Sequence, residues 1–522
     1  MKLRIWAKEN RKRIIGAVSF GLLPLIFCSI YCALYHKGLW DIYLPTSYWN
    51  DELFYFKQVD GILAHGVPGG YFGFNESHGR FLSFAAWSPV LLYVWVFWGL
   101  LFGWGILSPI ICNLVVISLC MFAFAWMAKP GRRQMIAMAI LLGVFSPFTR
   151  YIMSMSLEVL CCSLLFVYMG ALFGYERDRK NGYLWIMMIA SAILTLTRPY
   201  FVLLVLYPAF FYGKQGVKKR IPAIGIPVGA FGGYALLKYL FSAEYLHSLF
   251  EISFLTKFWE EGIGAGFLNL WTVGKNGVLL IFDFLKKAVK YGHSSGCFYA
   301  IYGLLGVLLF VMVFMEWRQR KNKSTCYRVM CMIATMAIML LAILYMYKAH
   351  EGSRHLLTFI LVGILMLGMY ENRKGIVLQV TFLAALSFFF VVKAGTPYDY
   401  LPPFDDGVVS REVSTMQSGL EEKMELQKGI GWDNTIVWLA SDMKDGESVI
   451  ASWQQLYAVP GGFGINYCTY DYVYYNLGSM KSRYIAAIPG GDVEKMLVEE
   501  GALLLEANEK IAVYDRRPDE TN

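Results

Sequence analysis

Residues 48–56 read Tyr-Trp-Asn-Asp-Glu-Leu-Phe-Tyr-Phe and place two adjacent carboxylates, Asp51 and Glu52, just after the first long apolar segment. From Asp51 to Ala64 only Gly61 disfavours a helix, and Gly66 is positioned to end it. The apolar side chains of this helix fall on one arc, which predicts a helix that lies along the membrane interface. The two acids border that arc, so we expect them to point towards buried protein. The alternative is that they only complement the helix dipole.

The composition indicates a membrane protein that crosses the bilayer many times. Of 522 residues, 57% are hydrophobic and 16% are charged, whereas soluble domains average about 25% charged residues. The net charge of +9 comes from basic residues in short loops between apolar segments, where they set membrane orientation. This distribution argues against nucleic-acid binding. Most of the ten cysteines lie inside apolar segments, so neither a disulfide framework nor a zinc site is indicated.

Basic residues also predict the topology. A basic N-terminus precedes the apolar segment 14–35, which is typical of an uncleaved anchor with a cytoplasmic N-terminus. The segment 105–128 leads directly into Lys129, Arg132 and Arg133, so it must run inward. The apolar segment 83–103 therefore cannot cross, and we expect it to form a second interfacial helix.

The apolar stretch 183–213 is interrupted by Arg198-Pro199 and has basic residues at both flanks. Both flanks should be cytoplasmic, which predicts a hairpin with Arg198 at its apex. Each arm would reach roughly 22 Å, short of a hydrocarbon core of about 30 Å. A charged apex at that depth is tolerated only where it lines a protein or water-filled cavity.

These assignments predict an all-α polytopic membrane protein with about 11 transmembrane helices, two interfacial helices in the first outer loop and a small C-terminal extracytoplasmic α/β domain. The transmembrane domain would span residues 1–395, with outer loops at 36–104 and 241–296. Alternating β-like and helix-like segments predict the α/β domain at 396–522. We expect the plasma membrane as the location, with the C-terminus outside.

Ionisable residues converge on the outer side in this topology. The cations among them suit an anionic lipid head, and the carboxylates suit an acceptor hydroxyl that must lose a proton. Each has a structural alternative. Arg354 and Lys348 could be interfacial anchors, Glu158 could be a surface residue, and Arg198 could form a salt bridge that holds its hairpin. Residues of the outer loops and turns have the same alternative of a purely structural role: His78, Arg80 and Arg150.

Several short motifs join Asp51-Glu52 in this layout: Ser156-Leu157-Glu158, Thr195-Leu196-Thr197-Arg198 and Gly352-Ser353-Arg354-His355-Leu356-Leu357. With the inside-out anchor, the two interfacial helices and the outer C-terminal domain, the chain resembles the GT-C superfamily of integral-membrane glycosyltransferases. It is most similar to the branch of protein O-mannosyltransferases and lipid A aminoarabinose transferases.

The resemblance implies inverting transfer of a sugar from a polyprenyl-phosphate-linked donor to a glycan, lipid or protein acceptor at the outer face. Asp51 would be the catalytic base, with Glu52 positioning it or the acceptor. Glu158 would line the cavity, and Arg198 and Arg354 would face the donor phosphate. The remaining candidates for donor or acceptor binding are His355, Lys348, Arg80 and Arg150.

We expect no obligatory cofactor, although Asp51 and Glu158 could share one divalent cation. Two other functions remain open. One is a transporter or flippase of lipid-linked glycans, which would also place charges in a cavity. The other is a non-catalytic envelope assembly protein.

Overall fold

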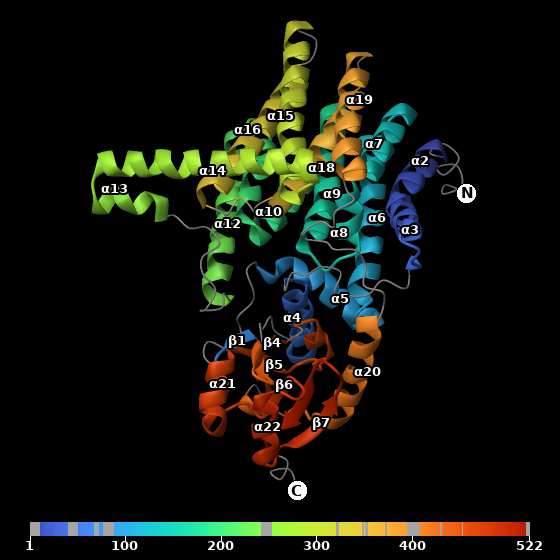
Figure 1. Ribbon diagram of the computed structural model, residues 1–522. Helices are drawn as coiled ribbons and strands as arrows, with labels where there is room; N and C mark the ends of the chain where they lie inside the picture. Colours follow the sequence, from blue (N-terminus) through green and yellow to red (C-terminus); the bar gives the residue numbers. More distant parts are fainter. Residues whose placement is uncertain are drawn as a thin grey trace.

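The computed structural model describes residues 11–39, 51–66, 72–76, 88–241, 253–319, 323–346, 349, 353–370, 373–393, 408–427, 431–451 and 453–517. It consists of a bundle of apolar helices and a smaller α/β domain at one end of that bundle (Figure 1). This arrangement confirms the predicted fold class. The bundle contains α2 (Arg11–Gly21), α3 (Leu23–Leu34), α6 (Ser108–Ala128), α7 (Arg132–Val144), α8 (Ser146–Ile152), α9 (Leu157–Asp178), α10 (Asn181–Thr197), α11 (Val202–Gly213), α12 (Val217–Phe241), α15 (Ser294–Gln319), α16 (Lys323–Met346), α18 (Leu356–Gly368) and α19 (Arg373–Ser387).

Eight helices in the described part of the chain are long and apolar enough to cross a membrane, or nine if the bent pair α7 and α8 forms one span. The prediction of about 11 crossings counted the bent pair as one crossing and added three shorter apolar helices, α10, α11 and α18, but it left out residues 263–291. The chain is therefore a multi-pass membrane protein in which several apolar helices are shorter than a typical span.

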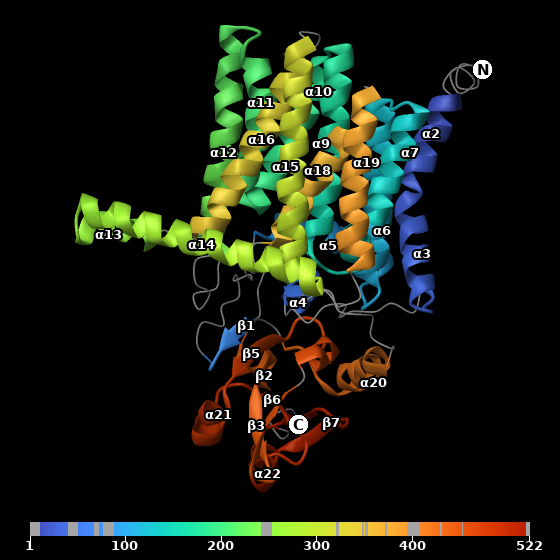
Figure 2. The same ribbon diagram turned by 45° about the horizontal axis from the view of Figure 1, so that its top comes forward.

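Helix α14 (Ile263–Tyr291) passes the same test of length and composition. It nevertheless lies across the bundle rather than along it (Figure 2), and large apolar side chains such as Phe267 and Trp271 are exposed. The sequence predicted an outer loop at 241–296. Residues 263–291 instead form one continuous amphipathic helix, as is typical of a helix in the membrane interface.

The hairpin around Arg198 is present. Helix α10 ends at Thr197, Arg198 has an extended backbone, and a short 3-10 turn, η3 (Pro199–Phe201), leads into α11. A residue that precedes proline disfavours the helical conformation, which explains why the helix breaks at this point. Arg198 thus lies at the apex between two short, apolar arms.

The first outer loop contributes two helices below the bundle. Helix α4 (Asp51–His65) ends at Gly66, whose φ of +77° suits glycine. Burial on α4 is not confined to its apolar arc, because the polar side chains of Lys57 and Gln58 are buried too. The reason is that α4 lies between the bundle and the α/β domain (Figure 1). Helix α5 (Leu92–Phe102) is too short to cross a membrane.

The α/β domain is built on a six-stranded sheet of order β1-β5-β2-β6-β8-β7. The first four strands in this order are parallel, β8 pairs antiparallel with β6, and β7 pairs antiparallel with β8. The edge strand β1 (Phe72–Phe74) comes from the first outer loop, so this sheet joins that loop to the C-terminal part of the chain. The other elements are α20 (Val408–Lys423), β2 (Thr435–Leu439), β3 (Ser441–Lys444), β4 (Glu447–Ile450), β5 (Gly464–Cys468), α21 (Tyr470–Asn476), β6 (Tyr484–Ala487), α22 (Asp492–Glu499), β7 (Leu503–Ala507) and β8 (Ala512–Asp515).

Candidate active site

Glu158, in the first turn of α9, lies at the centre of a buried charged cluster. Its Oε1 accepts a hydrogen bond from Nη2 of Arg198 at 2.8 Å and lies 3.9 Å from Nε of Arg354. Nδ1 of His355 is 3.0 Å from Nη1 of Arg198 and 3.8 Å from the same carboxylate oxygen. One carboxylate therefore faces two arginines that come from distant parts of the chain.

Asp51 closes this cluster on the side of the first outer loop. Its Oδ2 lies 2.7 Å from Nη2 of Arg354. The side chains of Asp51 and Arg354 are 20% and 12% exposed, whereas those of Glu158 and Arg198 are 2% and 1% exposed. The cluster thus has a buried half around Glu158 and a more accessible half around Asp51.

Local sequence places each of these groups at a break between helices. Glu158 begins α9 after a short turn, which Asn113 of α6 holds by donating from Nδ2 to the carbonyls of Ile152 and Ser154 at 3.1 and 2.7 Å. Arg354 lies in a single 3-10 turn, η5 (Ser353–His355), that starts α18. The backbone groups at a helix end have no partner within the helix, so they and the neighbouring side chains are free to face a cavity. Several helix ends can therefore meet in one cavity.

Glu52 and Arg150 lie beside this cluster and have other partners. Glu52 is fully buried and accepts a hydrogen bond from the backbone N–H of Met155 at 2.8 Å. Arg150 of α8 is 1% exposed, close enough to Glu52 for an electrostatic interaction, and its guanidinium lies 5.7 Å from the ring of Tyr31. Glu52 therefore anchors α4 to the turn before α9, one residue from Asp51.

Two tyrosines that the sequence did not single out as site residues border the cluster. The hydroxyl of Tyr200 accepts from Nη1 of Arg198 at 3.2 Å. Tyr55, one turn after Asp51 on α4, is 3% exposed, and burial raises its pKa well above the usual value. The signal for Tyr200 was its place two residues after Arg198. Tyr55 carried no signal that distinguished it from the other apolar residues of its arc.

Two predicted site residues, Arg80 and Lys348, lie outside the described residues, as does His78. Among the residues that the structure does describe, no group of three histidine, cysteine, aspartate or glutamate side chains could hold a metal ion. Asp51 and Glu158, the two carboxylates considered for a shared cation, each contact an arginine.

An apolar groove of about 660 Å³ opens between α3, α7 and α8, on the same side of the bundle as Arg150. Its walls include Phe27, Tyr31, Gly143 and Phe390, and Thr149 precedes Arg150 at its edge. A groove with these walls can hold an alkyl or isoprenoid chain.

No protein-family model and no curated protein matches the chain. Among solved structures, it is similar to the archaeal oligosaccharyltransferase AglB from Archaeoglobus fulgidus in complex with an inhibitory peptide and a dolichol-phosphate. That similarity has 8% sequence identity and a TM-score of 0.47, and covers 99% of this chain and 75% of that one.

The chain is also similar to ArnT from Cupriavidus metallidurans, in one structure bound to undecaprenyl phosphate and in another in the apo state. The identities are 11% and 12%, with TM-scores of 0.42 and 0.41. The similarity covers 96% and 94% of this chain, and 98% and 97% of those chains. AglB and ArnT are GT-C glycosyltransferases, the superfamily that the sequence motifs resemble.

Proposed function

We propose that this protein is an integral-membrane glycosyltransferase that moves a sugar from a polyprenyl-phosphate-linked donor to a glycan, lipid or protein acceptor. The observation that supports it most is the chain of contacts from Asp51 through Arg354 to Glu158 and Arg198. It combines a partly accessible carboxylate with one partly accessible and one buried arginine at the end of the bundle that faces the α/β domain. A proton acceptor next to guanidinium groups is what transfer from a phosphate leaving group requires.

In the proposed reaction, a hydroxyl of the acceptor attacks the anomeric carbon of the donor sugar. Asp51 takes the hydroxyl proton as the new glycosidic bond forms. The bond between the anomeric carbon and the phosphate oxygen breaks, and its electron pair leaves with the polyprenyl phosphate. Attack from the side opposite the leaving group inverts the anomeric configuration.

The two arginines have different roles in this proposal. Arg354 is the more accessible and lies 2.7 Å from Asp51, so it is the better placed to bind the leaving phosphate. Arg198 is bound to Glu158 and His355 in the buried half. We assign Arg198, Glu158 and His355 as positioning residues that hold the guanidinium of Arg354 in place from behind.

The donor would enter from the membrane. Nucleotide sugars are cytoplasmic, so a site on the outer face of the plasma membrane requires a lipid-linked donor. The groove beside Arg150 is a candidate for the isoprenoid chain. No divalent cation is obligatory in this scheme, since arginine supplies the positive charge. Transfer that survives EDTA would agree with this, and transfer that stops until Mg²⁺ or Mn²⁺ is restored would refute it.

The decisive experiment replaces Asp51 by Asn in the full-length protein in proteoliposomes. General-base catalysis contributes about 10²–10⁴ in rate, so transfer of radiolabelled sugar from a polyprenyl-phosphate donor should fall by that factor. Donor binding and thermal stability should be retained. Glu260→Gln, an exposed carboxylate of α13 (Thr256–Glu260), is the matched control and should transfer at the wild-type rate.

The same variant separates the other candidate functions. A flippase would move the lipid-linked sugar across the vesicle membrane without transferring it, in both the wild type and the Asp51→Asn protein. A non-catalytic assembly protein would show no transfer in either. Transfer by Asp51→Asn at the wild-type rate would exclude Asp51 as the base.

A further inference from the structure

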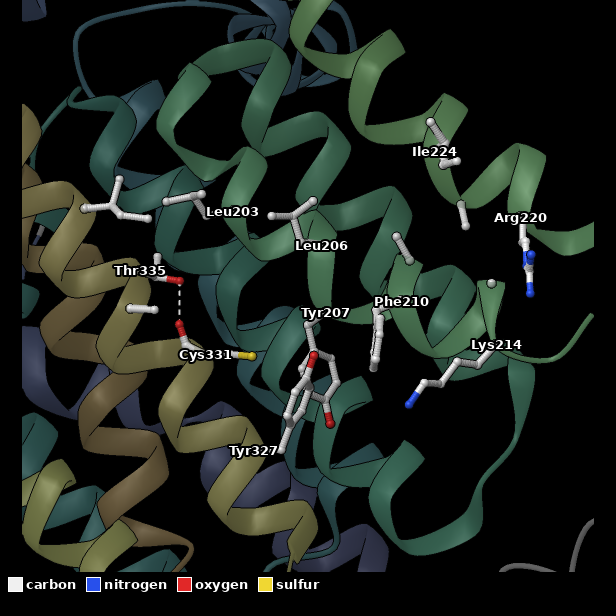
Figure 3. A pocket seen from close by; sticks show the side chains of 15 residues that line it. Leu203, Leu206, Tyr207, Phe210, Lys214, Arg220, Ile224, Tyr327, Cys331 and Thr335 are labelled. Atoms are coloured by element: carbon white, nitrogen blue, oxygen red, sulfur yellow. Dashed lines mark hydrogen bonds between the residues drawn. The ribbon is translucent and has the colours of Figure 1, made fainter.

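A second groove, of about 630 Å³, lies between α11, α12 and α16 (Figure 3). It runs along α11, and its basic end, at Lys214 and Arg220, is the end that lies away from the candidate active site. Helix α11 starts next to Arg198 and its twelve residues carry the chain about 18 Å away from it. The groove is therefore separate from the charged cluster around Glu158.

The walls of this groove are apolar, and its basic residues lie on one side. Leu203, Leu206 and Ile338 line it, whereas Lys214 and Arg220 project on the side where α11 meets α12 (Figure 3). Small side chains keep it open on α16, where Ala334 is exposed.

The two basic residues of the groove have no carboxylate partner in the described part of the chain. Lys214 and Arg220 are exposed and form no ion pair there, although Nζ of Lys214 lies 4.2 Å from the ring of Phe210. By contrast, the nearby Arg328 is paired with Glu176. The positive charge at this end of the groove is thus available to an external anion.

The apolar walls and the basic residues of the groove together indicate a ligand with a hydrocarbon chain and an anionic head. An apolar groove that opens towards lipid can take a hydrocarbon chain, and cations at its end match a phosphate. This end of the bundle also carries Arg179 and Lys180, and is the cytoplasmic end in the predicted orientation.

We propose that this groove binds one anionic phospholipid of the cytoplasmic leaflet. Its phosphate would lie between Lys214 and Arg220, and one acyl chain would lie along Leu203, Leu206 and Ile338. This site does not depend on the proposed glycosyl transfer, since it shares no residue with the charged cluster.

The test is native mass spectrometry of the full-length protein, delipidated and then titrated with phosphatidylglycerol or phosphatidylcholine of the same acyl chains. The wild type should retain phosphatidylglycerol in preference to phosphatidylcholine. A basic residue near a lipid surface contributes about fivefold in affinity. The double variant Lys214→Ala/Arg220→Ala should therefore lose at least about tenfold of its phosphatidylglycerol affinity.

Matched controls separate the site from general surface charge. Lys218→Ala/Lys219→Ala removes the same charge from the first turn of α12 but not from the groove lining, and should bind as the wild type does. Ala334→Trp should block the groove, whereas Ala337→Trp, exposed on the same helix but outside the groove lining, should not. An equal loss of phosphatidylglycerol affinity in the two double variants, or an affinity unchanged by Ala334→Trp, would overturn the proposal.

Discussion

Arg354 and Asp51 form an ion pair of 2.7 Å that joins the start of α18 to the first turn of α4. A phosphate that binds Arg354 must therefore compete with Asp51 for the guanidinium. Such competition would release the carboxylate when the donor arrives, so that the base is exposed to the acceptor only in the donor complex.

Replacement of Arg354 by Gln should weaken donor binding more than it slows the reaction of bound donor. A hydrogen bond to a charged group contributes about 1.5–3 kcal/mol, so KM for the polyprenyl-phosphate sugar should rise about tenfold or more. Steady-state kinetics in proteoliposomes would measure it. Arg411→Gln, which replaces an exposed arginine of α20, is the control. An equal KM in the two variants would show that Arg354 does not bind the donor.

The buried half of the cluster could be predicted from the sequence, because membrane topology restricts where charged residues can lie. Arg198 was predicted at a hairpin apex from the basic flanks of 183–213, and Glu158 at a short outer turn. The structure brings the two within 2.8 Å. The predicted alternative for Arg198, a salt bridge that holds the hairpin, describes this contact as well as a binding role does.

Other features depend on pairings that no local pattern reveals. Asn113 lies in an apolar segment and looks like a single polar interruption, yet it holds the turn before Glu158. The three residues of β1 are too few to show a periodic pattern, and their partner strand β5 is almost four hundred residues away. The burial of Lys57 likewise requires the α/β domain, which supplies the carbonyl of Val459 as its acceptor.

The changes at Glu158 and Arg198 should destabilise the protein less when combined than the sum of their separate effects. The pair is buried, with 2% and 1% exposure, and removal of one partner of a buried pair costs about 3–5 kcal/mol because the other charge stays behind. The double variant Glu158→Gln/Arg198→Gln should cost clearly less than the sum of the single variants. Thermal unfolding of all three in detergent would give the coupling energy.

The control is the same double-mutant cycle on Lys423 and Glu506. These residues form an ion pair of 2.7 Å, and their side chains are 45% and 28% exposed. Its coupling energy should be below about 1 kcal/mol. Additive losses at Glu158 and Arg198 would show that the two charges are independently stabilised.

The stability of the contact between α4 and the α/β domain should decrease as the pH rises. Burial raises the pKa of Asp60, an effect that the neighbouring ammonium of Lys57 opposes. A raised folded-state pKa means that the folded protein binds this proton more tightly than the unfolded chain does. The contribution is complete below the unfolded value of about 3.9 and is lost as the pH rises through the folded-state pKa.

Asp60→Asn should therefore flatten the decrease in unfolding temperature from about pH 4 upward. Asp471→Asn changes an exposed carboxylate of α21 and should leave the wild-type slope. A slope that is the same in all three proteins would mean that Asp60 titrates normally.

The first outer loop adds one edge strand, β1, to the sheet of the α/β domain. The carboxylate of Glu76, just after β1, accepts hydrogen bonds from the backbone N–H groups of Lys481, at 2.9 and 3.1 Å, and of Ser482, at 2.8 Å. Glu76→Ala leaves two backbone donors without this acceptor and should weaken the attachment of β1 by roughly 1–3 kcal/mol. Hydrogen exchange of residues 72–76 should then be faster, and cleavage by protease in the first outer loop should increase.

Two variants make this measurement specific. Glu76→Gln keeps one carbonyl oxygen as an acceptor and should lie between the wild type and Glu76→Ala. Glu447→Ala removes an exposed carboxylate of β4 and should exchange at residues 72–76 as the wild type does. Because α4 precedes β1 in the same loop and carries Asp51, detachment of β1 should also lower sugar transfer. Exchange at β1 that is unchanged in Glu76→Ala would mean that pairing with β5 alone holds the strand.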